Sequence, residues 1–506
     1  MQDAVVLLDF RIFVIMRRQE SGDKIKNGFR IKPGMTISVA FMGKMKSEII
    51  NKRSYDDAVK YLYALQKHGI KLGLDNTSRL LSLLGNPQDS FKAIHIAGTN
   101  GKGSTSAMIA AVLKTAGFKV GLFTSPHMVS FTERIRVNNA EIEERKVVEL
   151  TEEIREIIAG SKLPASNLEP RISSLNPTFF EFVTALGFLY FKREGVEWAV
   201  VETGMGGRLD ATNVLAPAVS VITNISYDHR EFLGETLKEI AGEKAGIIKK
   251  GVPVVSSAQE PEAMEVINGE AAEKGTDLFV HEKDFFSRPK HMDMYGITFD
   301  YEGKERLNDL HVPLCGMHQV ENASVAIKAL ELVGGKESIP SRFIREGLAH
   351  TKWQGRLELI KNRGCRYDVL VDGAHNPNAS RALADALKRY FIPRYEKIVL
   401  LLGIMSDKDA EGIMAPLLPL ASEIIFTAPD YERAAPPQKL AEYAGTLGFR
   451  SRATESVKAS IDLASGIAES GSQKTLIVIT GSFYTIGEAK MHLGEKCHSP
   501  SLARLR

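Results

Sequence analysis

The sequence predicts an α/β protein made of two doubly wound units, of which the first is the larger. Apolar runs of strand length alternate with stretches of helical periodicity along most of the chain, stop around residues 346–355 and then begin again. A glycine-rich loop at residues 98–104 also joins an apolar strand to a helix. Such alternation is typical of right-handed βαβ units, which build a mainly parallel sheet with helices on both faces. We therefore predict a boundary near residue 350.

The first unit is predicted to span residues 48–350. A helix begins near Ser54, and the less regular, charged stretch over residues 260–310 is predicted to be a short antiparallel section with YGITFDYEGK as a hairpin. The remaining strands are predicted at residues 91–97, 119–124, 198–202, 219–224 and 252–256, and the remaining helices at residues 104–116, 144–158, 179–192, 237–248 and 316–335.

The second unit, residues 351–490, repeats this pattern on a smaller scale. Its strands are predicted at Tyr367–Val371, Lys397–Leu402, Glu423–Phe426 and Thr475–Thr480, with helices between them. This arrangement is typical of a Rossmann-like, doubly wound domain, in which ligands sit at the carboxyl ends of the strands. Residues 491–506 are predicted to be a tail.

Length and composition exclude several classes of function. The chain has 506 residues, too many for one core, and its formal net charge of +3 gives no electrostatic footprint for nucleic acid. The three cysteines form no C-x-x-C pair, which argues against a zinc site and fits a reducing cytoplasm. The apolar run Ala4–Met16 is interrupted by charges and too short to span a bilayer, so no membrane contact is expected. Residues 1–47 are predicted to be an extension of unknown role, either a mis-assigned start or an added functional arm.

The stretch IHIAGTNGKGSTS, residues 94–106, is predicted to bind the phosphates of a nucleotide. Glycines let the backbone N–H groups approach an anion, Lys102 adds a positive charge, and the helix N-terminus adds its dipole. The usual phosphate loop has four residues between its first glycine and Gly-Lys, whereas this loop has only Thr99 and Asn100 there. A tight turn without a ligand is the alternative. The residues expected to contact the nucleotide are Gly98, Thr99, Asn100, Gly101, Lys102, Gly103 and Ser104.

Polar residues follow the later strands at their carboxyl ends. Glu202 ends one strand and, beside a phosphate loop, could hold Mg²⁺, although a solvated glutamate that caps a turn is the alternative. His229 follows the next strand, where a structural role and a metal or phosphate contact both stay open. Lys244 lies inside a helix among apolar neighbours, and the local pattern alone assigns it no role.

The second unit places Asp372 and His375 after one strand and Ser482 after another. Aspartate and histidine could act as an acid–base pair, but no nucleophile completes a triad, and turn formation is the alternative. Arg356, at the junction of the units, could reach a phosphate because a guanidinium stays charged and donates in a fork.

Ten short strings follow one another along residues 52–490: HIAGTNGKGS, TSPHMVSFTERIRVN, NPTFFEF, VETGMGGRLDATN, ISYDH, EKAGIIK, GMHQVENA, WQGRLE, DGAHNP and TGSFYTIG. In this order they resemble the folylpolyglutamate synthase/dihydrofolate synthase family, a branch of the Mur ligases. One departure is Met128, where leucine is usual.

The resemblance implies a Mur ligase-like fold, with an N-terminal P-loop-type ATPase domain, a smaller C-terminal Rossmann-like domain and the active site between them. It implies that ATP phosphorylates the carboxylate of a pteroate or folate, and that the amine of L-glutamate attacks the acyl phosphate to give an amide. It also implies two Mg²⁺ ions, small-molecule substrates only and a monomer. A peptidoglycan-precursor ligase and an ATP-driven switch are the alternatives; Gly103 disfavours the first, and DGAHNP and WQGRLE disfavour the second.

The resemblance also assigns individual residues. Catalysis is assigned to Lys102, Lys244 and His375, further ATP contacts are assigned to Asn322, Arg356 and Asp372, and glutamate binding is assigned to His375 and Ser482. Ser125 and Glu202 are assigned to one Mg²⁺ ion and His229 to a second, with Lys244 carboxylated as a ligand. The residues assigned to the pterin or folate are Leu72, Gly73, Leu74, His127, Thr178, Phe179, Phe180 and Leu209.

Overall fold

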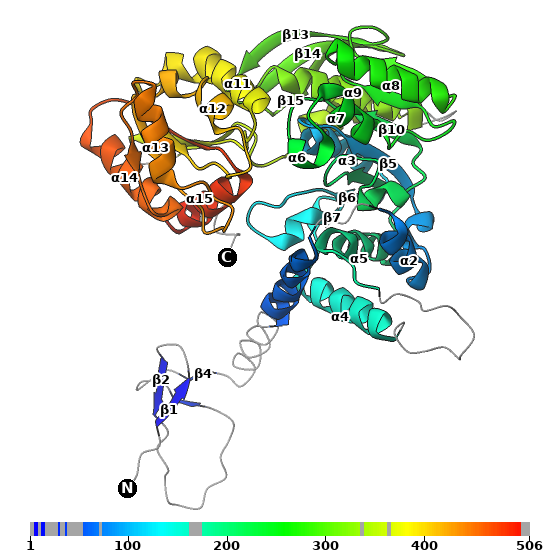
Figure 1. Ribbon diagram of the computed structural model, residues 1–506, viewed down its shortest axis with the longest axis horizontal. Helices are drawn as coiled ribbons and strands as arrows, with labels where there is room; N and C mark the ends of the chain where they lie inside the picture. The colour runs from blue at the N-terminus through cyan, green and yellow to red at the C-terminus, as the bar shows by residue number, and fades with distance from the viewer. Residues whose placement is uncertain are drawn as a thin grey trace, which may run out of the picture.

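The computed structural model describes residues 54–69, 73–160, 175–333, 339–361 and 366–496, together with four short strands nearer the N-terminus (Figure 1). These strands form two antiparallel pairs, β1 (Val5–Leu8) with β2 (Ile12–Ile15) and β3 (Phe29–Arg30) with β4 (Thr36–Ile37). The rest of the predicted extension, residues 1–47, lies outside the described residues. None of the helices described is long and apolar enough to cross a membrane.

The first unit is built on an eight-stranded sheet with the order β12-β11-β10-β5-β9-β6-β7-β8. The first six of these strands run parallel, and β7 and β8 complete one edge in antiparallel pairing. The strands are β5 (Lys92–Ala97), β6 (Val120–Phe123), β7 (Ile135–Val137), β8 (Ala140–Glu141), β9 (Trp198–Glu202), β10 (Val219–Ile222), β11 (Val254–Ser256) and β12 (Leu278–Val280).

Helices cover both faces of this sheet, as the apolar runs of the strands require. Alternate residues of β9 belong to different cores: Val200 packs with α3 and α9, whereas Val201 packs with α5 and α4. The helices are a helix at residues 54–64 with a 3₁₀ turn at Leu65–His68, α2 (Asp75–Leu83), α3 (Lys102–Thr115), α4 (Glu144–Gly160), α5 (Phe179–Arg193), α6 (Arg230–Leu233), α7 (Leu237–Ala245), α8 (Pro261–Glu273), α9 (His318–Val333) and α10 (Ser341–Ala349).

The prediction of a hairpin at YGITFDYEGK was wrong. This stretch is β14 (Gly296–Glu302), the central strand of a three-stranded antiparallel sheet between β13 (Phe286–Asp293) and β15 (Arg306–Val312). Ile297, Phe299 and Tyr301 are fully buried and give β14 a clear alternation. Most side chains of β13 are exposed or half-buried, so its sequence shows no such pattern.

The second unit contains a six-stranded sheet with the order β16-β17-β21-β18-β19-β20. All four strands predicted there have the predicted bounds. Only β16 runs antiparallel to its neighbour, and α15 continues to Lys496, beyond the predicted boundary at residue 490. The elements are β16 (Glu358–Ile360), β17 (Tyr367–Val371), β18 (Lys397–Leu402), β19 (Glu423–Phe426), β20 (Arg452–Ala453), β21 (Thr475–Thr480), α11 (Pro377–Ala386), α12 (Ala410–Met414), α13 (Pro437–Thr446), α14 (Val457–Ser470) and α15 (Phe483–Lys496). The predicted α/β fold class is therefore confirmed.

Candidate active site between the two sheets

The carboxyl ends of parallel strands from both units open into one cavity of about 940 Å³. From the first unit it is lined by the residues that follow β5, β6 and β10 and by the end of β9. From the second unit it is lined by residues that follow β17, β18 and β21. Strand ends are where open α/β sheets bind ligands, and here two sheets share the site.

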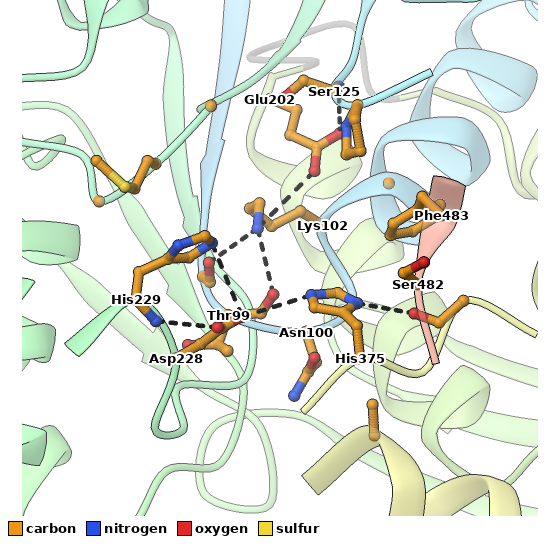
Figure 2. Close-up of a pocket in the computed structure, with 18 of the residues that line it drawn as sticks. Thr99, Asn100, Lys102, Ser125, Glu202, Asp228, His229, His375, Ser482 and Phe483 are labelled. Carbon is orange, nitrogen blue, oxygen red and sulfur yellow. Dashed lines mark hydrogen bonds and ion pairs between the residues drawn. The ribbon is translucent and has the colours of Figure 1, made fainter. Parts of the chain in front are cut away.

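The predicted strand–loop–helix arrangement around Lys102 is confirmed. Gly101 has φ 93° and caps the N-terminus of α3, and a Cβ atom on Gly98 would collide with the hydroxyl of Thr223. The Lys102 ammonium donates to the carbonyl oxygens of Gly98 (3.1 Å) and Thr99 (3.2 Å) and lies 3.9 Å from Glu202 Oε1 (Figure 2). The loop therefore combines a flexible backbone, a helix N-terminus and a cation on one side of the cavity.

Glu202 and Ser125 come from neighbouring parallel strands and meet at the cavity wall. The Ser125 backbone N–H donates to Glu202 Oε2 at 3.3 Å, and Glu202 is only 4% exposed. Burial raises the pKa of Glu202, and the charge of Lys102 opposes this shift. Among the residues described, no cluster of three or more His, Cys, Asp or Glu side chains could enclose a metal. Mg²⁺ needs no such cluster, because it keeps waters and takes phosphate oxygens beside one or two carboxylates. The pair of Ser125 and Glu202 therefore fits a Mg²⁺ ion.

Lys244 points into the same region from the last turn of α7. It is 4% exposed, and its ammonium donates to the carbonyl oxygen of Gly98 at 2.9 Å. No ion pair joins it to a carboxylate in the described part of the chain. Burial, followed by the positive charge of Lys102, lowers the pKa of Lys244 to about 7.

Asp228 connects the two units. Its Oδ1 lies 2.6 Å from the Lys408 ammonium and its Oδ2 lies 3.4 Å from His375 Nε2, and both partners belong to the second unit. Burial alone would raise the pKa of Asp228, but the hydrogen bond and charge of His375, with His229 and Lys408, lower it well below its usual value. Asp228 is therefore an anion held in a cationic setting.

The two histidines near Asp228, His229 and His375, differ in what they contact. His229 has φ 50° and directly precedes α6, with its ring nitrogen 4.0 Å from Asp228 Oδ2; burial lowers its pKa to about 4. His375 holds its ring by donating from Nδ1 to the carbonyl oxygen of Gly373 at 2.7 Å, which leaves Nε2 facing Asp228 (Figure 2).

Arg356, Asp372 and Asn322 also line the cavity. Asp372 accepts the backbone N–H groups of Leu357 (2.8 Å) and Ala374 (2.9 Å); burial raises its pKa, against the charge of Arg356. The Arg356 guanidinium lies 4.7 Å from the centre of the Phe483 ring. The structure thus brings every predicted nucleotide residue to one cavity, and their roles stay predictions.

The predicted pterin residues are only partly brought together. Gly73, Thr178, Phe179, Phe180 and Leu209 line the cavity, and Leu72 lies outside the described residues.

Leu74 and His127 are not among the residues that line the cavity, so their assignment to the pterin stays a prediction. Leu74 serves as the residue before α2. The His127 ring is held by Tyr63 Oη (2.8 Å) and Arg134 Nε (2.7 Å), and burial lowers its pKa to about 3. Arg134 takes its place in the lining.

Ser482 lines the cavity but already has partners. Its Oγ accepts the Thr485 backbone N–H at 3.0 Å and lies 2.8 Å from Thr485 Oγ1, so it caps the start of α15. Its predicted contact with glutamate stays a prediction beside this structural role.

Sequence reasoning missed Lys408 and Arg134. Lys408 follows β18, and the strand-end rule that singled out Asp372 would have found it. Arg134 ends a 3₁₀ turn, Phe131–Arg134, directly before the amino end of β7, where the rule for carboxyl ends of strands does not apply.

Comparisons with known proteins agree with this architecture. Residues 96–330 match the Mur ligase middle domain, and residues 355–483 match the glutamate ligase domain of Mur ligases. The dihydrofolate synthase/folylpolyglutamate synthase of Bacillus subtilis is 34% identical over 452 residues, which is 87% of this chain and 99% of that protein.

Solved structures agree as well. A folylpolyglutamate synthase of Mycobacterium tuberculosis, complexed with ADP and AMPPCP, has a TM-score of 0.78 at 33% identity and covers 86% of this chain and 98% of its own. The Escherichia coli protein in complex with DHPP and ADP has a TM-score of 0.75 at 28% identity, with 87% and 98% covered.

Proposed function

This chain belongs to the Mur ligase family, in the branch of the folylpolyglutamate and dihydrofolate synthases, and from that membership we propose that it joins L-glutamate to dihydropteroate, to folates or to both at the expense of ATP. The single observation that supports this best is the shared cavity. It faces the phosphate loop of the first unit toward His375 and Ser482 of the second. A relative bound to ADP and another bound to DHPP and ADP support the same substrates.

The proposed reaction has two steps. A pterin-linked carboxylate oxygen takes the γ-phosphoryl group of ATP and ADP leaves. The glutamate nitrogen then attacks the acyl carbon, the bond from that carbon to the phosphate oxygen breaks, and the nitrogen loses a proton as the amide forms. Both steps move negative charge between oxygen atoms. Fixed cations such as Lys102 and Arg356 therefore stabilise the transition states of both steps.

The residues of the chain divide this work by position. The loop and Lys102 hold the β- and γ-phosphates, and Arg356 and Asp372 complete the nucleotide site from the second unit. Ser125 and Glu202 would hold one Mg²⁺ and His229 a second, and the ions would neutralise phosphate charge. His375, which is fixed by the Gly373 carbonyl, is assigned to the incoming glutamate.

Lys244 is proposed to be carboxylated on its side-chain nitrogen. Its buried ammonium has no carboxylate partner among the described ion pairs and lies beside a second ammonium. Conversion to a carbamate would replace that cation by an oxygen ligand, which suits Mg²⁺. We further propose that the enzyme acts as a cytoplasmic monomer and that the two units divide near residue 350.

Phosphate release tests the proposal. The purified protein is given ATP and glutamate with either dihydropteroate or tetrahydrofolate, and Lys102→Ala serves as the inactive control. We expect release that requires both glutamate and at least one pterin, and the pterin that works defines the substrate. Release that neither pterin stimulates would contradict the function.

A further inference from the structure

Trp353 lies directly against the phosphate loop. A Cβ atom at Gly103 would lie 2.9 Å from Trp353 Nε1 and 3.0 Å from its Cζ2, so the indole occupies the space that any side chain at residue 103 would need. Alanine is normally the better residue inside a helix, and Gly103 lies in the first turn of α3. The contact therefore gives the glycine between Lys102 and Ser104 a second reason, beside the approach of backbone N–H groups to a phosphate.

The segment after Trp353 is fixed to the second unit. The Lys490 ammonium is 1% exposed and donates to Gln354 Oε1 (2.7 Å) and to both carboxylate oxygens of Glu358 (2.9 and 2.8 Å). Gly355 N–H also donates to Glu358 Oε2 at 2.8 Å. Leu357 has φ 45°, a strained backbone for leucine, and its N–H is held by Asp372. These hydrogen bonds therefore tie residues 354–358 to α15 and to the end of β17.

We propose that Trp353 is a positioning residue that links the phosphate loop to Arg356, so that a nucleotide on the loop sets the position of the second unit. The indole touches the loop at one end of a six-residue segment, and Arg356 enters the nucleotide cavity from the same segment. The Arg136 guanidinium, 5.6 Å from the ring centre, supports the indole from β7. This inference rests on the proposed function, because it takes a nucleotide as the occupant of the loop.

A double-mutant cycle tests the contact. The dissociation constant of ADP is measured by calorimetry for the wild type, Gly103→Ala, Trp353→Ala and the double variant. We expect Gly103→Ala to weaken ADP binding about tenfold in the wild-type background but less than about threefold once the indole is absent, because neighbouring residues couple when they share space. An equal effect in both backgrounds would overturn the inference. A wild type that binds no ADP would instead overturn the proposed function.

Fluorescence separates positioning from a merely structural role. The chain has two tryptophans, so in a Trp198→Phe background the emission reports Trp353 alone. We expect ADP to change this emission with the same dissociation constant that calorimetry gives, and Trp353→Phe to bind ADP more tightly than Trp353→Ala. If Trp353 emission does not change when ADP binds, or if Trp353→Phe binds ADP no more tightly than Trp353→Ala, the inference is overturned.

Discussion

At the scale of single residues, the buried ammonium of Lys244 is costly, since desolvation penalises an ion without an oppositely charged partner. If the residue is a carbamate ligand, Lys244→Ala should lower ligase turnover on the order of a hundredfold, because an oxygen ligand near the phosphates is lost. Added acetate or propionate should restore part of the activity. Lys238→Ala, on the exposed side of the same helix, is the control and should leave turnover unchanged.

Carbon-13 NMR of protein equilibrated with labelled carbon dioxide gives a second measurement. A carbamate signal should appear in the wild type and in Lys238→Ala and be absent from Lys244→Ala. If short carboxylates fail to rescue activity and no carbamate signal is found, Lys244 is an ordinary buried lysine.

His95 predicts a pH dependence of stability. It is fully buried on β5, its Nε2 lies 2.8 Å from Thr212 Oγ1, and burial followed by the charge of Lys249 lowers its pKa to about 3. The folded chain therefore stays neutral at His95 while the unfolded chain gains a proton below about pH 6.5. Its contribution to stability is complete above that pH and is lost as the pH falls toward 3.

The variant His95→Gln should remove this dependence. Between pH 7 and pH 5.5 its free energy of unfolding should fall about 1 kcal/mol less than that of the wild type, as measured by urea unfolding. His291→Gln, whose side chain is 74% exposed, should follow the wild type. Parallel curves for all three proteins would show that His95 takes up a proton in the folded state.

Some of these residue-level features could be read from the sequence and others could not. Glu202 and Asp372 were each predicted to lie at a ligand-binding edge because ligands sit at the carboxyl ends of parallel strands, whereas only the family resemblance assigned both residues to one site. The pairing of His127 could not be predicted, since its partner Tyr63 lies 64 positions earlier in the chain. The helix around Lys244 offers little polar face, which was visible in the sequence, but its hydrogen bond to the Gly98 carbonyl, 146 positions earlier, was not.

At the scale of elements, α15 packs closely against the opposite unit at Met128. A Cβ atom on Gly487 would collide with the Met128 carbonyl group, whose carbon would be 2.9 Å away, and backbone cannot yield as a side chain can. Gly487→Ala should therefore lower the free energy of unfolding by about 1–3 kcal/mol, as overpacking does, and reduce ligase activity.

Gly466→Ala on α14 is the matched control, because nothing lies within 4 Å of the added methyl group. It should keep full activity and raise stability by up to about 1 kcal/mol, which is the ordinary gain of alanine in a helix. Thermal unfolding and ligase turnover are measured for both variants. Equal behaviour of the two would show that α15 does not press on Met128.

The bounds of a strand were predicted correctly where its own sequence is a continuous apolar run. β17, β18, β19 and β21 are apolar runs buried on both faces, and each has the bounds that its sequence predicts. β13 failed because its side chains are mostly exposed, so pairing with β14 rather than apolar periodicity makes it a strand.

At the scale of the whole molecule, the order of the motifs predicted the two units and their shared site, but no string predicted what joins them. Asp228 and Lys408 are 180 positions apart in the chain, and only the fold brings them to 2.6 Å. Both side chains are at most 10% exposed, so salt screens this pair far less than an exposed one.

The Asp228–Lys408 ion pair is expected to hold the two units close together. Lys408→Met keeps most of the apolar side chain and removes its ammonium group, which leaves Asp228 with His375 and Asn376 as remaining partners from the second unit. Loss of one member of a buried pair costs about 3–5 kcal/mol when the other charge stays buried, and opening of the cavity to water would relieve that cost. The radius of gyration from X-ray scattering should therefore increase and ligase turnover should fall. Lys397→Met, which breaks a pair with Glu423 inside the second unit, should change neither. Unchanged scattering and turnover for Lys408→Met would mean that the Trp353 segment and α15 hold the units together without Asp228.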